Sequence, residues 1–368
     1  MIYAHIPFCE SKCPYCSFNS FALALADFGA YFRALIAQFH RDRADWLAAG
    51  REDFGTLYIG GGTPSIVGAG YYEPFFAAVS PFLERGAEIT IEANPNSLTI
   101  EWARAMRGFG VNRLSIGVQS FDDRKLAVLG RAHSGAQAKA ALRNAAAAGF
   151  EQICVDLIYG VLGDDFGLLT RDLAAARENG ANHISAYSLT IEEGAAIDKN
   201  LSVEDCDLER AFSEAIAAEF PRYEVSNYGK RRSRHNLGYW RGDDYLGLGA
   251  GAVGTISVGV GGVGGVGGAE LGGVIGGRVR YEPPKSIAKY LENPLARSTI
   301  AIGKAEYDSE RLMLGLRFDE GFSRSILNAK QQKRADILIQ EGKLTTNSDR
   351  LFNCDLWLAD EIWLFLNG

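Results

Sequence analysis

The chain has 368 residues, 47% of them hydrophobic and 23% charged, which is ordinary for a soluble globular protein with one large domain and a smaller one. Its net charge of −7 argues against nucleic acid or an anionic membrane surface as the main partner. No long apolar run and no signal-peptide pattern are present, so we expect no transmembrane helix and a cytoplasmic location with reduced thiols. Peripheral membrane association and the oligomeric state are left open.

Strand-like and helix-like segments alternate over the first 220 residues. Short apolar runs predict strands at 2–6, 56–65, 88–97, 112–121, 152–160 and 183–190. Helical spacing of apolar residues predicts helices at 27–49, 71–84, 99–108, 134–149, 168–179 and 206–220. Such regular alternation indicates a parallel sheet with helical crossovers. Because no Rossmann glycine fingerprint follows the first strand, we expect a barrel-like α/β sheet, open or closed.

The second half of the chain is less regular. Residues 257–277 are about half glycine, which predicts a flexible loop or a loosely paired hairpin because glycine is entropically costly to order. We predict three parts: a barrel over 1–220, a covering segment over 221–284 and a small, mostly helical C-terminal domain over 285–368.

Polar and glycine-rich motifs follow successive predicted strands at the point where each strand ends. The carboxyl ends of parallel strands meet at one edge of a barrel, so these motifs are expected to share one site. They are the cysteine loop, the glycine turn 60–63, Glu92 with Asn94, Gln119 and Asp156.

Three cysteines lie within eight residues near the start, in the spacing Cys9-x3-Cys13-x2-Cys16. A structural zinc ion requires four protein ligands, and the chain has no second CxxC pair, although His5 is a possible fourth ligand. Three thiolates suit a [4Fe–4S] cluster with one iron left open, which is the interpretation we favour over zinc or no metal. The isolated Cys154, Cys206 and Cys354 are expected to be buried.

Five ordered motifs carry a resemblance to a known family. They are "YAHIPFCESKCPYCSFNS", "YIGGGTPS", "RLSIGVQSFDDRKLAVLGRAH", "DLIYGV" and "HNLGYWRGDDYLGLGAGA". The cysteine spacing is similar to the radical S-adenosylmethionine (radical SAM) superfamily, and the whole set resembles the oxygen-independent coproporphyrinogen III oxidase family. The resemblance covers about residues 1–256 and implies a partial (β/α)6, TIM-like barrel.

The resemblance also implies cofactors and the residues that hold them. Cys9, Cys13 and Cys16 would ligate a [4Fe–4S] cluster, and S-adenosylmethionine would bind its open iron. The residues that match the family's cofactor contacts are Tyr3, Tyr15, Phe18, Gly61, Gly62, Thr63, Glu92, Gln119, Arg131 and Asp156. No catalytic residue is assigned.

Within the family, the chain resembles the heme chaperone (HemW) branch, which is thought to hand heme to respiratory enzymes. The oxidases carry a fourth cysteine where this chain has Phe18, and an extension before the cysteine loop, where this chain has eight residues. The branch motif HNxxYW matches 235–240, so heme contacts are expected from His235, Asn236, Tyr239 and Trp240. The basic run 230–234 would pair with heme propionates.

Three other functions stay open. The first is coproporphyrinogen III oxidase activity, which the branch assignment leads us to expect absent. The second is radical chemistry on an unknown substrate, and the third is a structural zinc protein.

Overall fold

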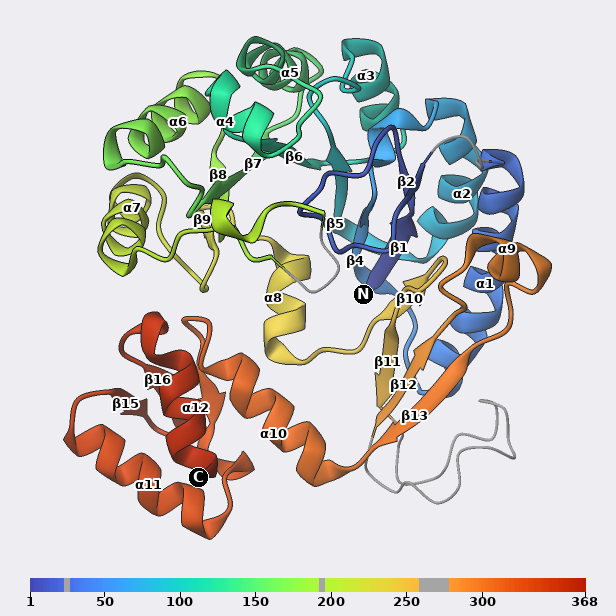
Figure 1. Ribbon diagram of the computed structural model, residues 1–368. Helices are drawn as coiled ribbons and strands as arrows, with labels where there is room; N and C mark the ends of the chain where they lie inside the picture. Colours follow the sequence, from blue (N-terminus) through green and yellow to red (C-terminus); the bar gives the residue numbers. More distant parts are fainter. Residues whose placement is uncertain (23–26, 192–195, 258–277) are drawn as a thin grey trace.

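The computed structural model describes residues 1–22, 27–191, 196–257 and 278–368, and its largest feature is an open, curved sheet of eight strands (Figure 1). Six strands run parallel and lie side by side in chain order. They are β1 (Ile2–Ile6), β4 (Phe54–Gly61), β5 (Leu83–Ala93), β6 (Arg113–Gln119), β7 (Gln152–Tyr159) and β8 (His183–Ser188). This confirms the predicted α/β fold with a partial (β/α)6, TIM-like barrel.

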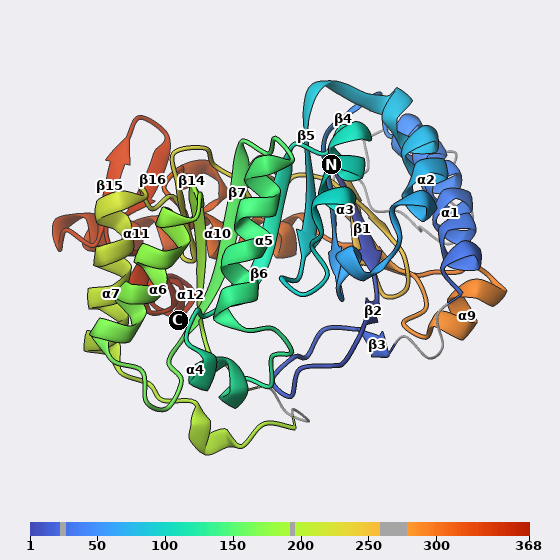
Figure 2. The same ribbon diagram turned by 90° about the horizontal axis from the view of Figure 1, so that it is seen from above.

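Helices follow the six strands and cover their outer face (Figure 2). They are α1 (Phe28–Ala48), α2 (Tyr72–Val79), α3 (Ile100–Gly108), α4 (Asp123–Val128), α5 (Gly135–Ala147), α6 (Phe166–Glu178) and α7 (Cys206–Glu219). Most begin at a polar N-cap residue whose side chain accepts from a free backbone N–H, which stabilises the first turn. Ser134 and Gln137 form a full capping box at the start of α5.

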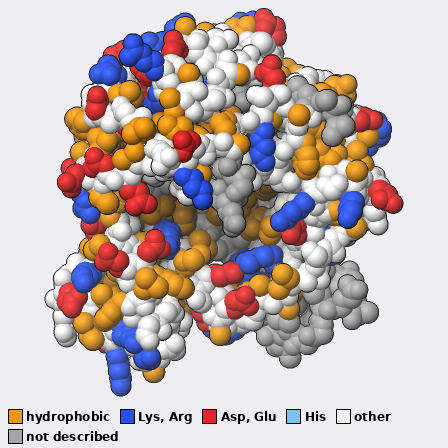
Figure 3. Space-filling view, in the orientation of Figure 1, with side chains coloured by type: hydrophobic (Ala, Val, Ile, Leu, Met, Phe, Trp, Pro, Cys, Tyr) orange, Lys and Arg blue, Asp and Glu red, His pale blue; other side chains and the backbone are white. Residues whose placement is uncertain are grey.

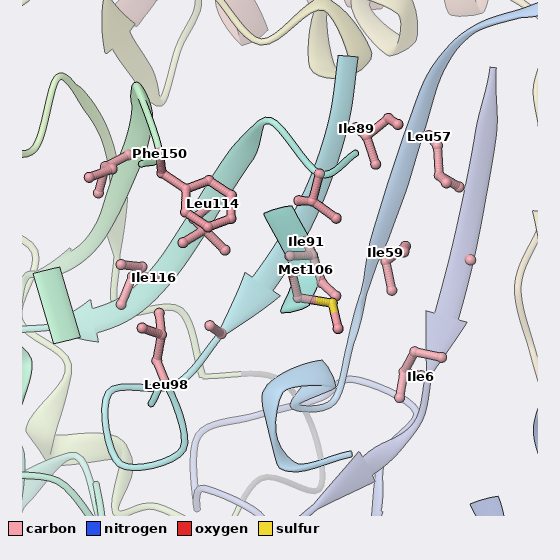
Figure 4. Packing of buried hydrophobic residues seen from close by; sticks show 14 of the residues in the cluster. Ile6, Leu57, Ile59, Ile89, Ile91, Leu98, Met106, Leu114, Ile116 and Phe150 are labelled. Carbon is pink, nitrogen blue, oxygen red and sulfur yellow. The ribbon is translucent and has the colours of Figure 1, made fainter. Parts of the chain in front are cut away.

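Alternating side chains explain how the strands build both a core and a site. In β6, Leu114, Ile116 and Val118 are fully buried against the helices. Figure 4 shows Leu114 and Ile116 within this apolar layer, together with Ile59, Ile91 and Met106. The intervening β6 residues point to the opposite, inner face, where polar groups collect.

Short strands that the sequence patterns did not resolve extend the sheet at both edges. β10 (Leu246–Leu248) pairs in parallel with β1, and β9 (Asn227–Gly229) pairs antiparallel with β8. A separate antiparallel sheet contains β11 (Gly254–Ser257), β12 (Arg278–Glu282) and β13 (Ser298–Ile302). Helices α8 (Arg234–Arg241) and α9 (Ile287–Glu292) complete this region. The loop predicted at 257–277 lies outside the described residues, except for its first residue.

The last part of the chain has its own apolar core. Its helices are α10 (Lys304–Gly315), α11 (Ala329–Gln340) and α12 (Ala359–Asn367). A small sheet that the helical pattern did not predict packs with them and contains β14 (Phe322–Ser323), β15 (Leu344–Asn347) and β16 (Arg350–Asn353). β13, in the predicted C-terminal domain, pairs with β12, in the predicted covering segment, so these two parts share a sheet. The three-part division of the chain stays a proposal.

Candidate cofactor site

A cavity of about 490 Å³ lies inside the barrel and receives side chains from the ends of successive strands. Most of the residues predicted for the cofactors line it: Cys9, Cys13, Tyr15, Cys16, Phe18, Gly61, Gly62, Thr63, Glu92, Gln119, Arg131 and Asp156. Of the residues predicted for heme, only Asn236 lines it. Tyr3 lies outside the lining, where its hydroxyl hydrogen-bonds to His5 Nδ1 at 2.9 Å.

The cysteine loop forms one wall of the cavity and is bracketed by two short parallel strands, β2 (Phe8–Cys9) and β3 (Phe21–Ala22). Cys9 is buried, and Cys13 and Cys16 are half-buried. The Thr63 hydroxyl donates to Cys9 Sγ at 3.7 Å, and Arg131 Nη1 donates to Cys13 Sγ at 3.2 Å. A hydroxyl and a guanidinium directed at sulfur stabilise negative charge there.

The arrangement of the loop bears on which metal it suits. Within the described residues, no three His, Cys, Asp or Glu side chains are grouped to hold one metal ion. An iron–sulfur cluster does not need such convergence, because each thiolate binds a different iron. His5 is buried and its second ring nitrogen hydrogen-bonds to the Asn19 carbonyl at 2.9 Å, so it does not serve as a fourth zinc ligand. Of the isolated cysteines, Cys154 is buried as expected, whereas Cys206 and Cys354 are exposed, so that prediction was wrong for these two.

The glycine turn after β4 is required by close backbone packing. A Cβ at Gly62 would lie 2.6 Å from the Phe8 carbonyl oxygen, and Gly61 has φ of 116°. The Gly62 amide donates to the Ile6 carbonyl at 2.8 Å, and the Thr63 amide donates to the Phe8 carbonyl at 2.7 Å. The turn is therefore joined directly to the cysteine loop, and its backbone faces the cavity without side chains in between.

Two half-buried carboxyl groups, Glu92 and Asp156, face the cavity. Glu92 accepts from the Tyr58 hydroxyl at 2.8 Å and from the Gly61 amide at 3.0 Å, and burial raises its pKa to about 7. Burial also raises the pKa of Asp156, which accepts from Ser115 Oγ at 3.1 Å. These groups can accept hydrogen bonds from hydroxyl or ammonium groups of a bound molecule.

Gln119 and Arg131 also line the cavity. Gln119 has φ of 66°, an uncommon backbone conformation for a residue other than glycine, at a register shift in the pairing of β6 with β7. Arg131 Nη2 donates to Asn94 Oδ1 at 2.9 Å and to the Gly117 carbonyl at 2.8 Å, which fixes its guanidinium beside the cysteines. Backbone strain of this kind is concentrated at functional sites.

The floor of the cavity contains residues that the sequence analysis missed. Arg113, Ser115 and Gly117 of β6 line the cavity together with Gln119, whereas the residues between them are apolar and buried. This period of two was visible in "RLSIGVQ", and it would have placed an arginine on the inner face.

Helix α8, which carries the HNxxYW motif, packs against the beginning of β4, where His235 hydrogen-bonds to Thr56; Figure 1 shows α8 beside β4 and β5. His235 is 1% exposed, and both of its ring nitrogens have partners: Nδ1 hydrogen-bonds to Thr56 Oγ1 at 2.7 Å and Nε2 to the Tyr239 hydroxyl at 3.1 Å. Trp240 is half-buried beside a small apolar cluster that includes Leu237. The predicted heme residues therefore do not form an open surface.

The start of α8 is held by a buried carboxylate that the sequence analysis did not single out. Glu88 accepts from the Arg234 amide at 2.9 Å, the His235 amide at 3.0 Å and Ser233 Oγ at 3.4 Å. A carboxylate at a helix N-terminus is favoured by the free amides and by the helix dipole. Glu88 thus fixes the position of His235 through the backbone.

The basic run before α8 is engaged in surface ion pairs. Arg231 pairs with Glu151 at 3.0 Å, and Arg232 Nη1 donates to Asp319 Oδ1 at 3.0 Å. On the face drawn in Figure 3, acidic and basic side chains are interspersed rather than gathered by sign.

Comparisons with known proteins agree with this geometry. The Radical SAM superfamily profile matches residues 3–168. Heme chaperone HemW of Mycobacterium tuberculosis is 34% identical, over 95% of this chain and 90% of its own. Heme chaperone HemW of Escherichia coli is 38% identical, over 70% of each chain.

This chain belongs to the HemW family. Membership of the radical SAM superfamily implies a [4Fe–4S] cluster and S-adenosylmethionine as cofactors. The coproporphyrinogen III oxidase HemN of Escherichia coli has the same fold, with a TM-score of 0.76 over 100% of this chain and 89% of its own, at 19% identity. No described helix is long and apolar enough to span a bilayer.

Proposed function

We propose that this protein is a heme chaperone that binds a [4Fe–4S] cluster, S-adenosylmethionine and heme, and delivers heme to acceptor proteins of respiration. The observation that carries the proposal is the relationship to named heme chaperones over nearly the whole chain, at 34% identity across 95% of its length. Phe18, at the position where the resembling oxidases have a fourth cysteine, supports the same branch.

The residues of the cavity fit the two cofactors. Cys9, Cys13 and Cys16 would hold the cluster, and Arg131 beside Cys13 would offset its negative charge. The bare backbone at Gly62 leaves room for a ligand next to the cysteine loop. When bound, the cluster supplies the electron for reductive cleavage of S-adenosylmethionine.

The carboxyl groups and the cavity size suit S-adenosylmethionine. Glu92 and Asp156 would accept hydrogen bonds from its ribose hydroxyls or its ammonium group. A cavity of about 490 Å³ is in the range that encloses one ligand of this size. A second molecule as large as heme does not fit beside it, so heme would bind at the α8 end.

Iron coordination by His235 requires that α8 shift. Burial lowers the pKa of His235 to about 3, so its imidazole is neutral and chemically suited to bind heme iron. Both ring nitrogens are engaged, however, with Thr56 and Tyr239. Heme would therefore bind after α8 has shifted far enough to separate His235 from Thr56, with Tyr239 and Trp240 covering a porphyrin face.

The test of the proposal is a hemin titration of the anaerobically reconstituted protein, followed by its Soret absorbance. We expect saturable binding, which weakens in His235→Ala and not in His40→Ala, a substitution of the exposed histidine on α1. Circular dichroism of each variant separates lost binding from lost folding. Absence of a Soret band in the folded wild-type protein contradicts the proposal.

Oxidative decarboxylation of coproporphyrinogen III is the second candidate function. It is favoured by the cavity, which gathers most of the cofactor residues that the oxidase family resemblance assigns. The assay is anaerobic turnover with S-adenosylmethionine, a strong reductant and coproporphyrinogen III, with porphyrins separated by chromatography. Formation of protoporphyrinogen together with 5′-deoxyadenosine would establish oxidase activity in place of a pure chaperone role.

A further inference from the structure

Arg113, on the floor of the cavity, is a buried cation with an unused hydrogen-bond donor. It begins β6 and is 2% exposed, which makes it one of the largest fully buried side chains of the described residues. It lines the cavity, yet its Nη2 has no hydrogen-bond partner among the described residues. Buried charged donors in native proteins are nearly always paired, so this one requires an explanation.

The surrounding carboxylates compensate the charge of Arg113, but their oxygens are directed to other donors. Glu88 and Asp156 both act electrostatically on Arg113. The oxygens of Glu88 accept from α8, and those of Asp156 accept from Ser115 Oγ and Cys154 Sγ. What the guanidinium lacks is an acceptor oxygen, which a ligand in the cavity can supply.

The floor also adjoins the helix that carries the heme motif. Asn236 of α8 lines the same cavity as Arg113, and the ring of Tyr58, another lining residue, lies 5.2 Å from the ring of His235. A guanidinium presents two parallel donors that match a carboxylate, and the amide of Asn236 offers a further donor. The residues at the floor therefore suit an anionic, planar oxyanion.

We propose that Arg113, with Asn236, binds a propionate carboxylate of the tetrapyrrole when heme enters from the α8 end. This inference rests on the proposed function, because it assigns a ligand carboxylate to the same protein's heme site. The basic run 230–234 is the competing partner for propionates, but Arg231 and Arg232 are exposed and already paired with Glu151 and Asp319, and Arg234 donates to the Gly86 carbonyl at 3.0 Å. Exposed pairs of this kind contribute little to binding.

A second source of the carboxylate is the methionine part of S-adenosylmethionine. Arg131 is the cation beside the cysteines, where the open iron of the cluster would receive that group. Arg113 is at the opposite end of β6 from Gln119 and adjoins α8 instead. This position favours the tetrapyrrole as the source.

The experiment compares hemin with hemin dimethyl ester, in which both propionates are blocked, by Soret titration of the reconstituted protein. We expect the wild-type protein to bind hemin at least about tenfold more tightly than the ester. Arg113→Gln should bind the two equally, and the matched control Arg231→Gln/Arg232→Gln should keep the preference. Arg113→Lys, which keeps the charge, should retain part of the preference for hemin over the ester. It replaces Arg113→Gln in the test if that variant does not fold.

Each contrary outcome is distinct. Equal binding of hemin and its ester by the wild-type protein overturns the inference and leaves heme binding, and so the proposed function, intact. An unchanged hemin preference in Arg113→Gln, with loss of S-adenosylmethionine binding in equilibrium dialysis, assigns Arg113 to the other cofactor and also overturns it. Failure of the wild-type protein to bind either tetrapyrrole contradicts the proposed function itself.

Discussion

The two ends of the barrel are built in opposite ways. At the carboxyl end of the strands, glycine turns, the left-handed backbone of Gln119 and half-buried cysteines leave groups free for ligands. At the amino end, α8 is bonded to the barrel through Glu88 and Thr56, and its histidine is fully buried. The first end is organised for binding as it stands, whereas the second has to open before a large ligand can reach His235.

In a chaperone, the carboxyl end of the barrel would hold the cofactors and the amino end would bind and release the cargo. A preformed cofactor site holds its ligand continuously, and a closed site binds only when its open state is populated. Cargo that must be released again suits the second arrangement. Variants that affect only one end test whether the two ends act independently.

Removal of one cluster ligand is expected to have the largest effect. Cys13→Ala should reduce the iron and sulfide content of the reconstituted protein to near zero, because three thiolates are needed to hold the cluster. Hemin affinity should stay within about twofold of wild type if the ends are independent. Cys206→Ser is the matched control, since Cys206 is exposed and outside the cavity lining. A parallel loss of hemin binding in Cys13→Ala would show that the two ends are coupled.

Removal of Glu88, the carboxylate that holds the start of α8, is expected to have the next largest effect. Glu88→Ala leaves the two first amides of α8 and the charge of Arg113 without their carboxylate, so the free energy of unfolding should fall by about 3 kcal/mol in urea titrations. Hemin affinity should rise, because the closed position of α8 is weakened. Glu84→Ala, on the same strand but exposed, should change neither quantity. Weaker hemin binding in folded Glu88→Ala would argue that the closed position is the binding state.

The site at the carboxyl end of the barrel could be predicted from the sequence, whereas the surroundings of α8 could not, and the reason is the topology of the sheet. A run of parallel strands places every strand end at one edge, so the order of strands along the chain is enough to assign Cys9, Gly62, Glu92 and Asp156 to one site. The motif 235–240 follows the alternating part of the chain, and no such rule places it. Only the fold shows that its histidine is buried while its neighbour Asn236 faces the cavity.

The three-residue strands and the helix-capping role of Glu88 were not predicted, because neither leaves a local signal in the sequence. β9 and β10 are too short to show a period, and they form because they complete the edges of an existing sheet. Glu88 gives no local signal of its role either, since its partners come from residues 233–235, far along the chain. By contrast, the inward position of Arg113 was predictable, because its strand alternates clearly between polar and apolar residues.

Cofactor affinity should depend on pH through Glu92. Its pKa of about 7 in the free protein means that the carboxylate which would accept hydrogen bonds is partly protonated near neutrality. S-adenosylmethionine binding should therefore weaken as pH falls below 7, by at most about tenfold per unit, and level off above it. Equilibrium dialysis on both sides of this pKa measures the slope, and Glu92→Gln should flatten it. A slope that persists unchanged in Glu92→Gln would move the assignment to Asp156, whose pKa is also raised.

An acid titration tests whether the α8 end is closed in solution. Burial holds the pKa of His235 at about 3, below its ordinary value of 6.5, so the folded state binds fewer protons than the unfolded state between these values. The contribution to stability is complete above pH 6.5 and is lost as pH falls, by about 1.4 kcal/mol per unit. His235→Gln should reduce the acid slope of urea midpoints below pH 6.5 by about one proton, and His40→Gln should leave it unchanged. An unchanged slope in His235→Gln would mean that His235 titrates freely while the chain is folded, and α8 would then stand open without heme.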